Sequence, residues 1–252
     1  MLKAFYFLSK RNGMSREGYI DYYENSHQHL MMNNLPNPAD FRRHFFRWPE
    51  ISEGTQGAER PDSLTAITYK DMEDVNRSRE IYHSADFNPI IVADELRFID
   101  RDRTKLVLVQ EVIEGAEPQS WRPAPMDPGG KLLRLVWRSP HLTQAAFRAE
   151  DAHRKPVIWA SLPEVLDVRR NYVLSQDAGL PAEGHCADLH QCDLVEEYSF
   201  GSASAAAAAA ARLADLDLAK ADGLPAAAIQ VVPCDHYVTK FGASASSPAA
   251  GA

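Results

Sequence analysis

The chain has 252 residues, with 27 Lys plus Arg and 35 Asp plus Glu, so its formal net charge is −8. Apolar residues make up 45% and charged residues 25%, values typical of one large or two small globular domains. An acidic chain without a basic run argues against a nucleic-acid partner. No stretch approaches the ~20 apolar residues of a membrane span, so we expect no membrane partner. Three cysteines cannot all pair within one chain, which favours reduced thiols in a cytoplasmic protein.

The first half alternates strand-like and helix-like segments. Strands are expected where aromatic and β-branched residues cluster, at Lys3–Ser9, Phe41–Trp48, Leu64–Tyr69, Glu95–Ile99 and Lys105–Ile113. A helix is predicted over Tyr19–Met32, with Ser15 as its N-cap, and a second helix over Asp71–His83. Residues 50–60 read as a polar loop.

The second half follows the same order. Strands are expected at Lys131–Arg138, Val165–Leu174, Leu194–Phe200, Ile229–Val232 and His236–Phe241. One helix is expected after Thr143, which is placed as an N-cap, and an alanine-rich helix runs from Ser204 to Leu218.

Several landmarks recur in the two halves at similar spacing. The FRRHFF run that contains Arg43 corresponds to the VRRNYV run that contains Arg170. Arg43 lies 16 residues after His27, and Arg170 lies 17 residues after His153. Such an internal repeat predicts two copies of one structural unit, at residues 1–113 and 131–242. A Pro-rich linker would span residues 114–130, and residues 243–252 would form a flexible tail.

A unit with the order βαββαβ is the ferredoxin-like arrangement, which gives a four-stranded antiparallel sheet with helices on one face. The other face needs a cover, and two copies can cover each other. We therefore predict an α+β fold in which two ferredoxin-like repeats pack their antiparallel sheets as an α+β barrel. The sequence leaves open whether this barrel forms within one chain or between chains.

Three segments carry a family resemblance. They are Arg11-x2-Met14-Ser15-x3-Tyr19-x3-Tyr23-x3-His27, Phe41-Arg42-Arg43-His44-Phe45 and Ala93-Asp94-Glu95-x2-Phe98-Ile99-Asp100. In this order the first half, to about Gln110, resembles the EthD family of the dimeric α+β barrel superfamily. The second half resembles it less, because the third segment has no recognisable counterpart.

The resemblance implies a pocket for a small aromatic or polyketide-like molecule between sheet and helices, and association as a homodimer. Relatives in this superfamily include dehydratases and cyclases, cofactor-free oxygenases, lactone isomerases and haem-binding enzymes. Because one fold hosts all of these activities, the fold cannot choose among them.

The candidate catalytic residues are Tyr19, Tyr23, His27 and Arg43. The first three share one helix stripe at i, i+4 and i+8. An imidazole can take and give a proton near neutral pH, and the phenols could orient a ligand oxygen. Arg43 could stabilise a phenolate or enolate, but the arginine repeated as Arg170 favours a structural salt bridge.

The candidate substrate-binding residues are Phe5, Phe7, Phe45 and His153. Aromatic side chains suit an apolar aromatic ligand, although ordinary core packing accounts for aromatic residues equally well. His153 would belong to a second, altered site in the other repeat.

One run resembles a metal site, with His185, Cys186, His190 and Cys192 within eight residues. This spacing is cramped for tetrahedral zinc, whose ligands usually come as spaced pairs from separate elements. We therefore expect neither a metal nor a cofactor.

Together these features predict a cofactor-independent lyase that removes water or formaldehyde from a hydrophobic aromatic or polyketide-like molecule, with His27 as general acid and base. A cofactor-free oxygenase of phenolic substrates is the first alternative, and a haem or metal enzyme the next. A non-catalytic carrier of aromatic ligands and an assembly module also stay open.

Overall fold

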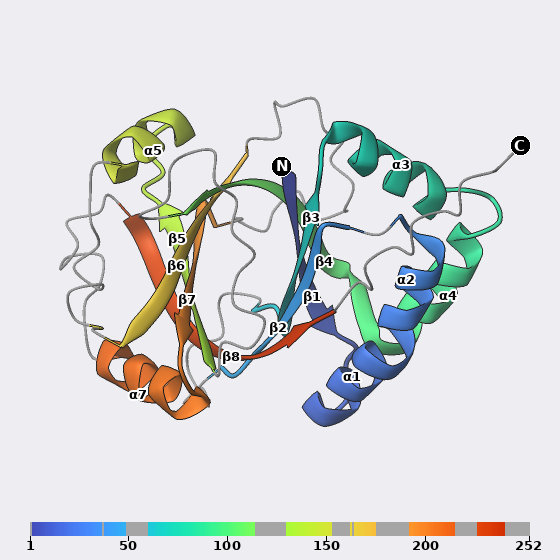
Figure 1. Ribbon diagram of the computed structural model, residues 1–252, viewed down its shortest axis with the longest axis horizontal. Helices are drawn as coiled ribbons and strands as arrows, with labels where there is room; N and C mark the ends of the chain where they lie inside the picture. Colours follow the sequence, from blue (N-terminus) through green and yellow to red (C-terminus); the bar gives the residue numbers. More distant parts are fainter. Residues whose placement is uncertain are drawn as a thin grey trace, which may run out of the picture.

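Eight antiparallel strands close into one barrel in the order β1-β3-β2-β8-β5-β7-β6-β4 (Figure 1). The computed structural model describes residues 2–36, 38–48, 60–113, 130–152, 162, 164–174, 192–214 and 226–239. The strands are β1 (Leu2–Lys10), β2 (Asp40–Phe46), β3 (Ser63–Tyr69), β4 (Ile99–Ile113), β5 (Gly130–Arg138), β6 (Val165–Val173), β7 (Leu194–Phe200) and β8 (Ala226–Val238).

Helices cover the barrel on two opposite sides (Figure 1). One side carries α1 (Arg16–Tyr22), the π-helical turn η1 (Tyr23–His27), α2 (Gln28–Asn34), α3 (Met72–Tyr82) and α4 (Asn88–Phe98). The other side carries α5 (Gln144–Ala152) and α7 (Ala203–Ala214).

Each half of the chain contributes four neighbouring strands in an equivalent order, β4-β1-β3-β2 and β8-β5-β7-β6. The seams between them are β2 with β8, from Arg42↔Val238 to Phe46↔Cys234, and β4 with β6. The α+β barrel therefore closes within one chain. Origin by duplication, the domain limits and the homodimer stay predictions.

The expected strand at Glu95–Ile99 is wrong, because this segment ends the helix α4 and begins β4 only at Ile99. Pro89 in the first turn favours a helix start. The buried residues Ile91, Asp94, Glu95 and Phe98 then follow at i, i+3, i+4 and i+7, which is the spacing of one helix face. The unbroken apolar run Ile90–Val92, which includes Ile91, hides this period in the sequence.

The last strand differs from prediction as well, because β8 is continuous through Pro233 instead of forming two pieces. The proline carbonyl accepts a hydrogen bond from the backbone N–H of Arg47 at 2.8 Å, and its register partner in β5 is Leu132. Phe241, the expected end of this strand, lies outside the described residues.

The barrel interior is apolar over much of its length. Its core is formed by side chains from all eight strands, including Phe5, Phe7, Phe46, Leu64, Val107, Leu133, Val173, Val195 and Val232. Because helices cover the outer face as well, most strands are buried on both faces; β3 and β7 are buried along their whole length. Alternation of apolar and polar residues is consequently weak in these strands.

A second part of the interior is ionic. Lys3 of β1 places Nζ 2.6 Å from Glu197 Oε1 of β7 and 2.7 Å from Glu111 Oε2 of β4. Asn171 of β6 donates to the same Glu197 oxygen at 3.0 Å. Lys131 Nζ lies 3.7 Å from the other oxygen, Oε2, in this buried cluster.

Two neutral imidazoles adjoin the ionic cluster. His44 and His236 stack with ring centroids 4.6 Å apart and Nδ1 atoms 3.1 Å apart. Burial lowers the pKa of His44 to about 3, and burial also lowers the pKa of His236 far below its usual range. The folded chain thus holds both rings uncharged near neutral pH.

We expect stability to fall as the pH drops from 6.5 towards 5. Histidines in the unfolded chain have a pKa of about 6.5 and bind protons below that pH, whereas the two buried rings stay neutral. Each ring then costs up to about 1.4 kcal/mol of unfolding free energy per pH unit. This pH range lies above 4.5, the ordinary pKa of the Glu197 carboxyl, and the fold lowers that pKa further. Titration of Glu197 therefore falls below the range in which the histidines act.

The measurement is urea unfolding across this pH range for wild type and for His44→Asn, since Asn171 occupies the matching position of β6 in the arginine motif. The variant should lose part of the pH slope. The matched control is His29→Asn at an exposed site, which should keep the slope. An unchanged slope in His44→Asn would contradict the assignment.

Candidate active site

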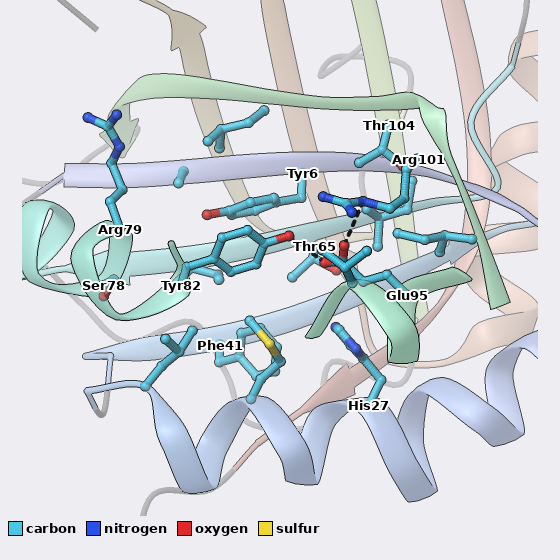
Figure 2. Close-up of a pocket in the computed structure, with 18 of the residues that line it drawn as sticks. Tyr6, His27, Phe41, Thr65, Ser78, Arg79, Tyr82, Glu95, Arg101 and Thr104 are labelled. Carbon is cyan, nitrogen blue, oxygen red and sulfur yellow. Dashed lines mark hydrogen bonds and ion pairs between the residues drawn. The ribbon is translucent and has the colours of Figure 1, made fainter. Parts of the chain in front are cut away.

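A cavity of about 520 Å³ lies between the outer face of the first-half strands and the helices that cover them (Figure 2). Strands β1, β2, β3 and β4 form one wall, with β2 contributing Phe41, and η1, α2, α3 and α4 form the other. Much of the lining is aliphatic, including Leu8, Met31, Leu35, Ile67, Val75 and Leu106. This volume and character suit a small apolar molecule.

His27 enters the cavity from a π-helical turn. The predicted helix forms, but Tyr23–His27 is wound as η1, and the N–H of Gln28 bonds to the carbonyl of Tyr23. Such a turn holds one residue more than an α-helical turn, and it is frequent at functional sites. Figure 2 shows the His27 ring pointing from this turn into the cavity.

The His27 ring is fixed by Asp94 of α4, whose Oδ2 lies 2.7 Å from Nδ1. Tyr22 donates to the other carboxylate oxygen of Asp94 at 2.7 Å. Burial alone would raise the pKa of Asp94, but the hydrogen bonds from His27 and Tyr22 outweigh it and hold the pKa below its usual value. An ionised Asp94 keeps the proton of His27 on Nδ1 and leaves Nε2 to act as a base.

The two predicted phenols occupy different places. Tyr23 lines the cavity, and its hydroxyl lies 2.7 Å from that of Thr65. Tyr19 is 1% exposed and bonds Ser63 at 2.7 Å, with Phe45 and Phe98 against its ring. It supports the wall from behind and is absent from the cavity lining. Burial raises the pKa of both phenols, so both stay protonated near neutral pH.

Arg43 forms a two-pronged ion pair with Glu24 of η1, with Nε 2.9 Å from Oε1 and Nη2 2.5 Å from Oε2. Arg170 pairs with Asp151 of α5 in the second half. Both carboxylates precede their arginines by 19 residues. This geometry supports a structural role for the repeated arginine, because the Arg43 side chain ties β2 to η1 and is not among the residues that line the cavity.

The predicted binding residues are divided among three environments. Phe5 and Phe7 lie in the barrel interior, on the opposite face of β1 from the cavity residues Tyr6 and Leu8. Phe45 packs against the rings of Tyr19 and Tyr23 behind the cavity wall. His153 lies outside the described residues.

The metal-like run is only partly described. Cys192 lies in the barrel core, where burial raises the pKa of its thiol to about 12, and the preceding residues 175–191 are outside the described ranges. Within the described segments, no group of three or more His, Cys, Asp or Glu side chains is arranged to hold a metal ion. None of the helices in those segments is both long and apolar enough to cross a membrane.

Sequence reasoning missed a polar group on the cavity wall. Tyr82 of α3 donates to Glu95 Oε1 at 2.8 Å, and Arg101 of β4 places Nε 3.0 Å from Glu95 Oε2. The role of Asp94 was missed as well. Both acidic residues belong to the Ala93-Asp94-Glu95 segment of the family resemblance, which was the available signal, but its helix was misread as a strand.

Comparisons with known proteins agree with the fold. Residues 11–102 match the family model described as EthD domain. A solved structure described as an anthrone oxidase-like protein is 12% identical, with a TM-score of 0.56 and 96% of each chain covered. No curated protein sequence matched.

Two further solved structures are more distant. A provisionally assigned monooxygenase from Fusobacterium nucleatum is 8% identical, with a TM-score of 0.48 and coverage of 96% of this chain and 94% of the other. A provisionally assigned chlorite dismutase is 11% identical, with a TM-score of 0.47 and coverage of 93% and 94%. The family resemblance is confirmed for residues 11–102, and the likeness to the anthrone oxidase-like structure shows the shared fold.

We expect Arg43→Met to lower the free energy of unfolding by about 3 kcal/mol, the lower end for breaking a buried ion pair. The lower end applies because the Glu24 side chain keeps 15% of its surface exposed. Urea unfolding measures this loss. Arg77→Met, at an exposed position of α3, is the control and should change stability by less than about 0.5 kcal/mol. If the Arg43 variant were as stable as wild type, the structural role would be wrong.

Proposed function

We propose that the chain is a cofactor-independent oxygenase of phenolic or polyketide-like aromatic molecules. In this proposal His27 removes a proton from the molecule in the cavity, and the resulting anion reacts with O2. One observation carries the proposal. A histidine oriented by a carboxylate, with 2.7 Å between His27 Nδ1 and Asp94 Oδ2, faces a largely apolar cavity of about 520 Å³.

The arrangement favours a base over an acid in the resting site. An ionised Asp94 fixes the tautomer in which Nε2 carries the lone pair, and it stabilises the imidazolium that forms on proton transfer. General-base catalysis of this kind typically contributes about 10²–10⁴-fold in rate. The apolar lining also keeps a bound aromatic anion away from bulk water, which strengthens its interactions with nearby dipoles.

The proposed reaction needs O2 and no further oxidant or reductant. Loss of a proton from an activated benzylic CH2 gives a carbanion delocalised over the aromatic rings, and that proton resides on His27. Addition of O2 gives a peroxide anion, which takes the proton back from His27 to form a CH–OOH group. Elimination of water then leaves a carbonyl, so the sum is CH2 + O2 → C=O + H2O.

In this proposal Tyr23 assists the anion. Its phenol is protonated near neutral pH, and either hydroxyl of the Tyr23–Thr65 pair can be the donor. When Thr65 donates to it, the Tyr23 O–H can point to an oxygen on the ligand. A hydrogen bond to an oxygen on which negative charge develops is a recurrent means of stabilising a transition state.

The lyase predicted from the sequence uses the same first step, because loss of water or formaldehyde also begins with a proton transfer. The likeness to a structure described as anthrone oxidase-like favours the oxygenase as a hypothesis. A carrier that binds an aromatic ligand without turnover is the remaining alternative. A homodimer remains part of the proposal only through the family resemblance.

Replacement of the base should abolish most of the activity. We expect His27→Ala to lower kcat by about 10²–10⁴-fold and Asp94→Asn to lower it as well, because the amide no longer selects the reactive tautomer. Oxygen uptake with an anthrone or a naphthalenediol as substrate measures turnover. His29→Ala, on the exposed surface of α2, is the matched control and should keep wild-type rates. Full turnover by His27→Ala would refute the mechanism.

Stoichiometry separates the oxygenase from the lyase. We expect one O2 consumed per product formed, with a mass gain of 14 Da for conversion of CH2 to C=O, following the equation above. Mass spectrometry and an oxygen electrode on the same reaction supply both values. A product lighter by water or formaldehyde, with no oxygen consumed, would select the lyase instead. Binding with no product from any substrate of the panel would favour the carrier.

A further inference from the structure

One end of the cavity carries a polar group that the proposed mechanism does not use. Tyr82, Glu95 and Arg101 come from α3, α4 and β4, and all three line the cavity (Figure 2). Glu95 accepts from Tyr82 O–H at 2.8 Å on one oxygen and pairs with Arg101 Nε at 3.0 Å on the other. The carboxylate is therefore held from two sides, and it in turn fixes the direction of the guanidinium.

The Arg101 pair differs from the structural ion pair of Arg43. Glu24 takes both Nε and Nη2 of Arg43, and the Arg43 side chain is 2% exposed. Glu95 engages Arg101 through Nε, and the Arg101 side chain is 36% exposed. A guanidinium has five N–H groups, and its two terminal nitrogens carry the four that Nε does not supply. The Tyr82 side chain also hydrogen-bonds Arg101, so part of this donor set holds the guanidinium in place and the rest can serve a ligand.

Those terminal nitrogens lie on the cavity side. Figure 2 shows Arg101 extended over Glu95, with the guanidinium directed towards Tyr82 and Tyr6 and with His27 across the cavity. Two terminal N–H groups in one plane match the two oxygens of a carboxylate, and such charge-assisted pairs are stronger than neutral hydrogen bonds. Burial raises the pKa of Glu95, which reflects the cost of holding this carboxylate in the apolar wall.

We propose that Arg101 binds a carboxylate on the substrate, with Glu95 and Tyr82 as positioning residues, so that the cavity selects aromatic acids over neutral aromatics. The inference rests on the proposed function for the identity of the reacting part, and it adds the class of molecule. The ligand would lie with its acidic group at Arg101 and its reacting carbon at His27.

A matched pair of probes tests this selectivity. At pH 7, 3-hydroxy-2-naphthoate carries a carboxylate, whereas 2-naphthol has the same rings and is neutral. Fluorescence titration gives the Kd of each probe, and the readout is the ratio of the two Kd values in one protein. A partly unfolded variant changes both values by the same factor, so the ratio survives loss of active protein.

Wild type should bind the naphthoate at least about tenfold more tightly than the naphthol, as expected for a charge-assisted hydrogen bond. Arg101→Gln should bring the ratio close to one, and Arg101→Lys should give an intermediate ratio because the planar fork is lost while the charge stays. Arg77→Gln, an exposed arginine on α3, should leave the wild-type ratio. Glu95→Gln should reduce the ratio less than Arg101→Gln does.

A wild-type ratio near one, no binding of the naphthoate, or an unchanged ratio in Arg101→Gln would overturn the proposal. A separate outcome tests the proposed function. His27→Ala should keep the binding ratio, since His27 acts on the reacting proton and not on the carboxylate. Retained turnover in His27→Ala would refute the base while leaving the selectivity of Arg101 intact.

Discussion

A buried ammonium on the first strand constrains the whole barrel. Lys3 cannot remain charged in the interior without anionic partners, and Glu111 and Glu197 supply them from β4 and β7. Glu197 belongs to the second half of the chain, so the ion pair fixes how the two four-stranded sheets face each other. With the charges confined to one part of the interior, Phe5 and Phe7 of β1 pack with apolar side chains of the other strands in the rest. The outer face of the same sheet is thereby left for the helices and the cavity.

The two halves share one ion-pair arrangement and differ in the side chains behind their first helix. In each, an arginine on the second strand pairs with a carboxylate 19 residues earlier, which anchors the first helical segment to the sheet. On the strands behind this helix, Tyr6 faces Thr65 in the first half, and the equivalent register position of the second half holds Arg134 opposite Glu196. The neutral pair in the first half leaves room for an apolar ligand. In the second half, Arg134 Nη1 lies 2.8 Å from Glu196 Oε2, and this ion pair occupies the equivalent position.

The sequence predicts more of the architecture than of the site. The βαββαβ order of each half predicted antiparallel sheets packed as an α+β barrel, but the sequence left open whether the barrel closes within one chain. Helical spacing put Tyr19, Tyr23 and His27 on one stripe, of which Tyr23 and His27 line the cavity and Tyr19 does not. Alternation along β1 puts Phe5 and Tyr6 on opposite faces of the strand. It does not identify the face that lines the barrel interior, because residues on both faces are buried. Asp94 lies 67 residues from His27 in the sequence, and the packing of α4 against η1 brings the two together. A local sequence pattern cannot predict such a partner.

The π-helical turn gives the site an unusual dependence on chain length. Because this turn holds one residue more than an α-helical turn, loss of one residue from Tyr23–His27 would leave a regular α-helical turn, with α1 and α2 still in phase on either side. The residues inside the turn would shift relative to both helices. A single inserted or deleted codon can therefore change which side chain this turn directs into the cavity, while the flanking helices keep their orientation on the sheet.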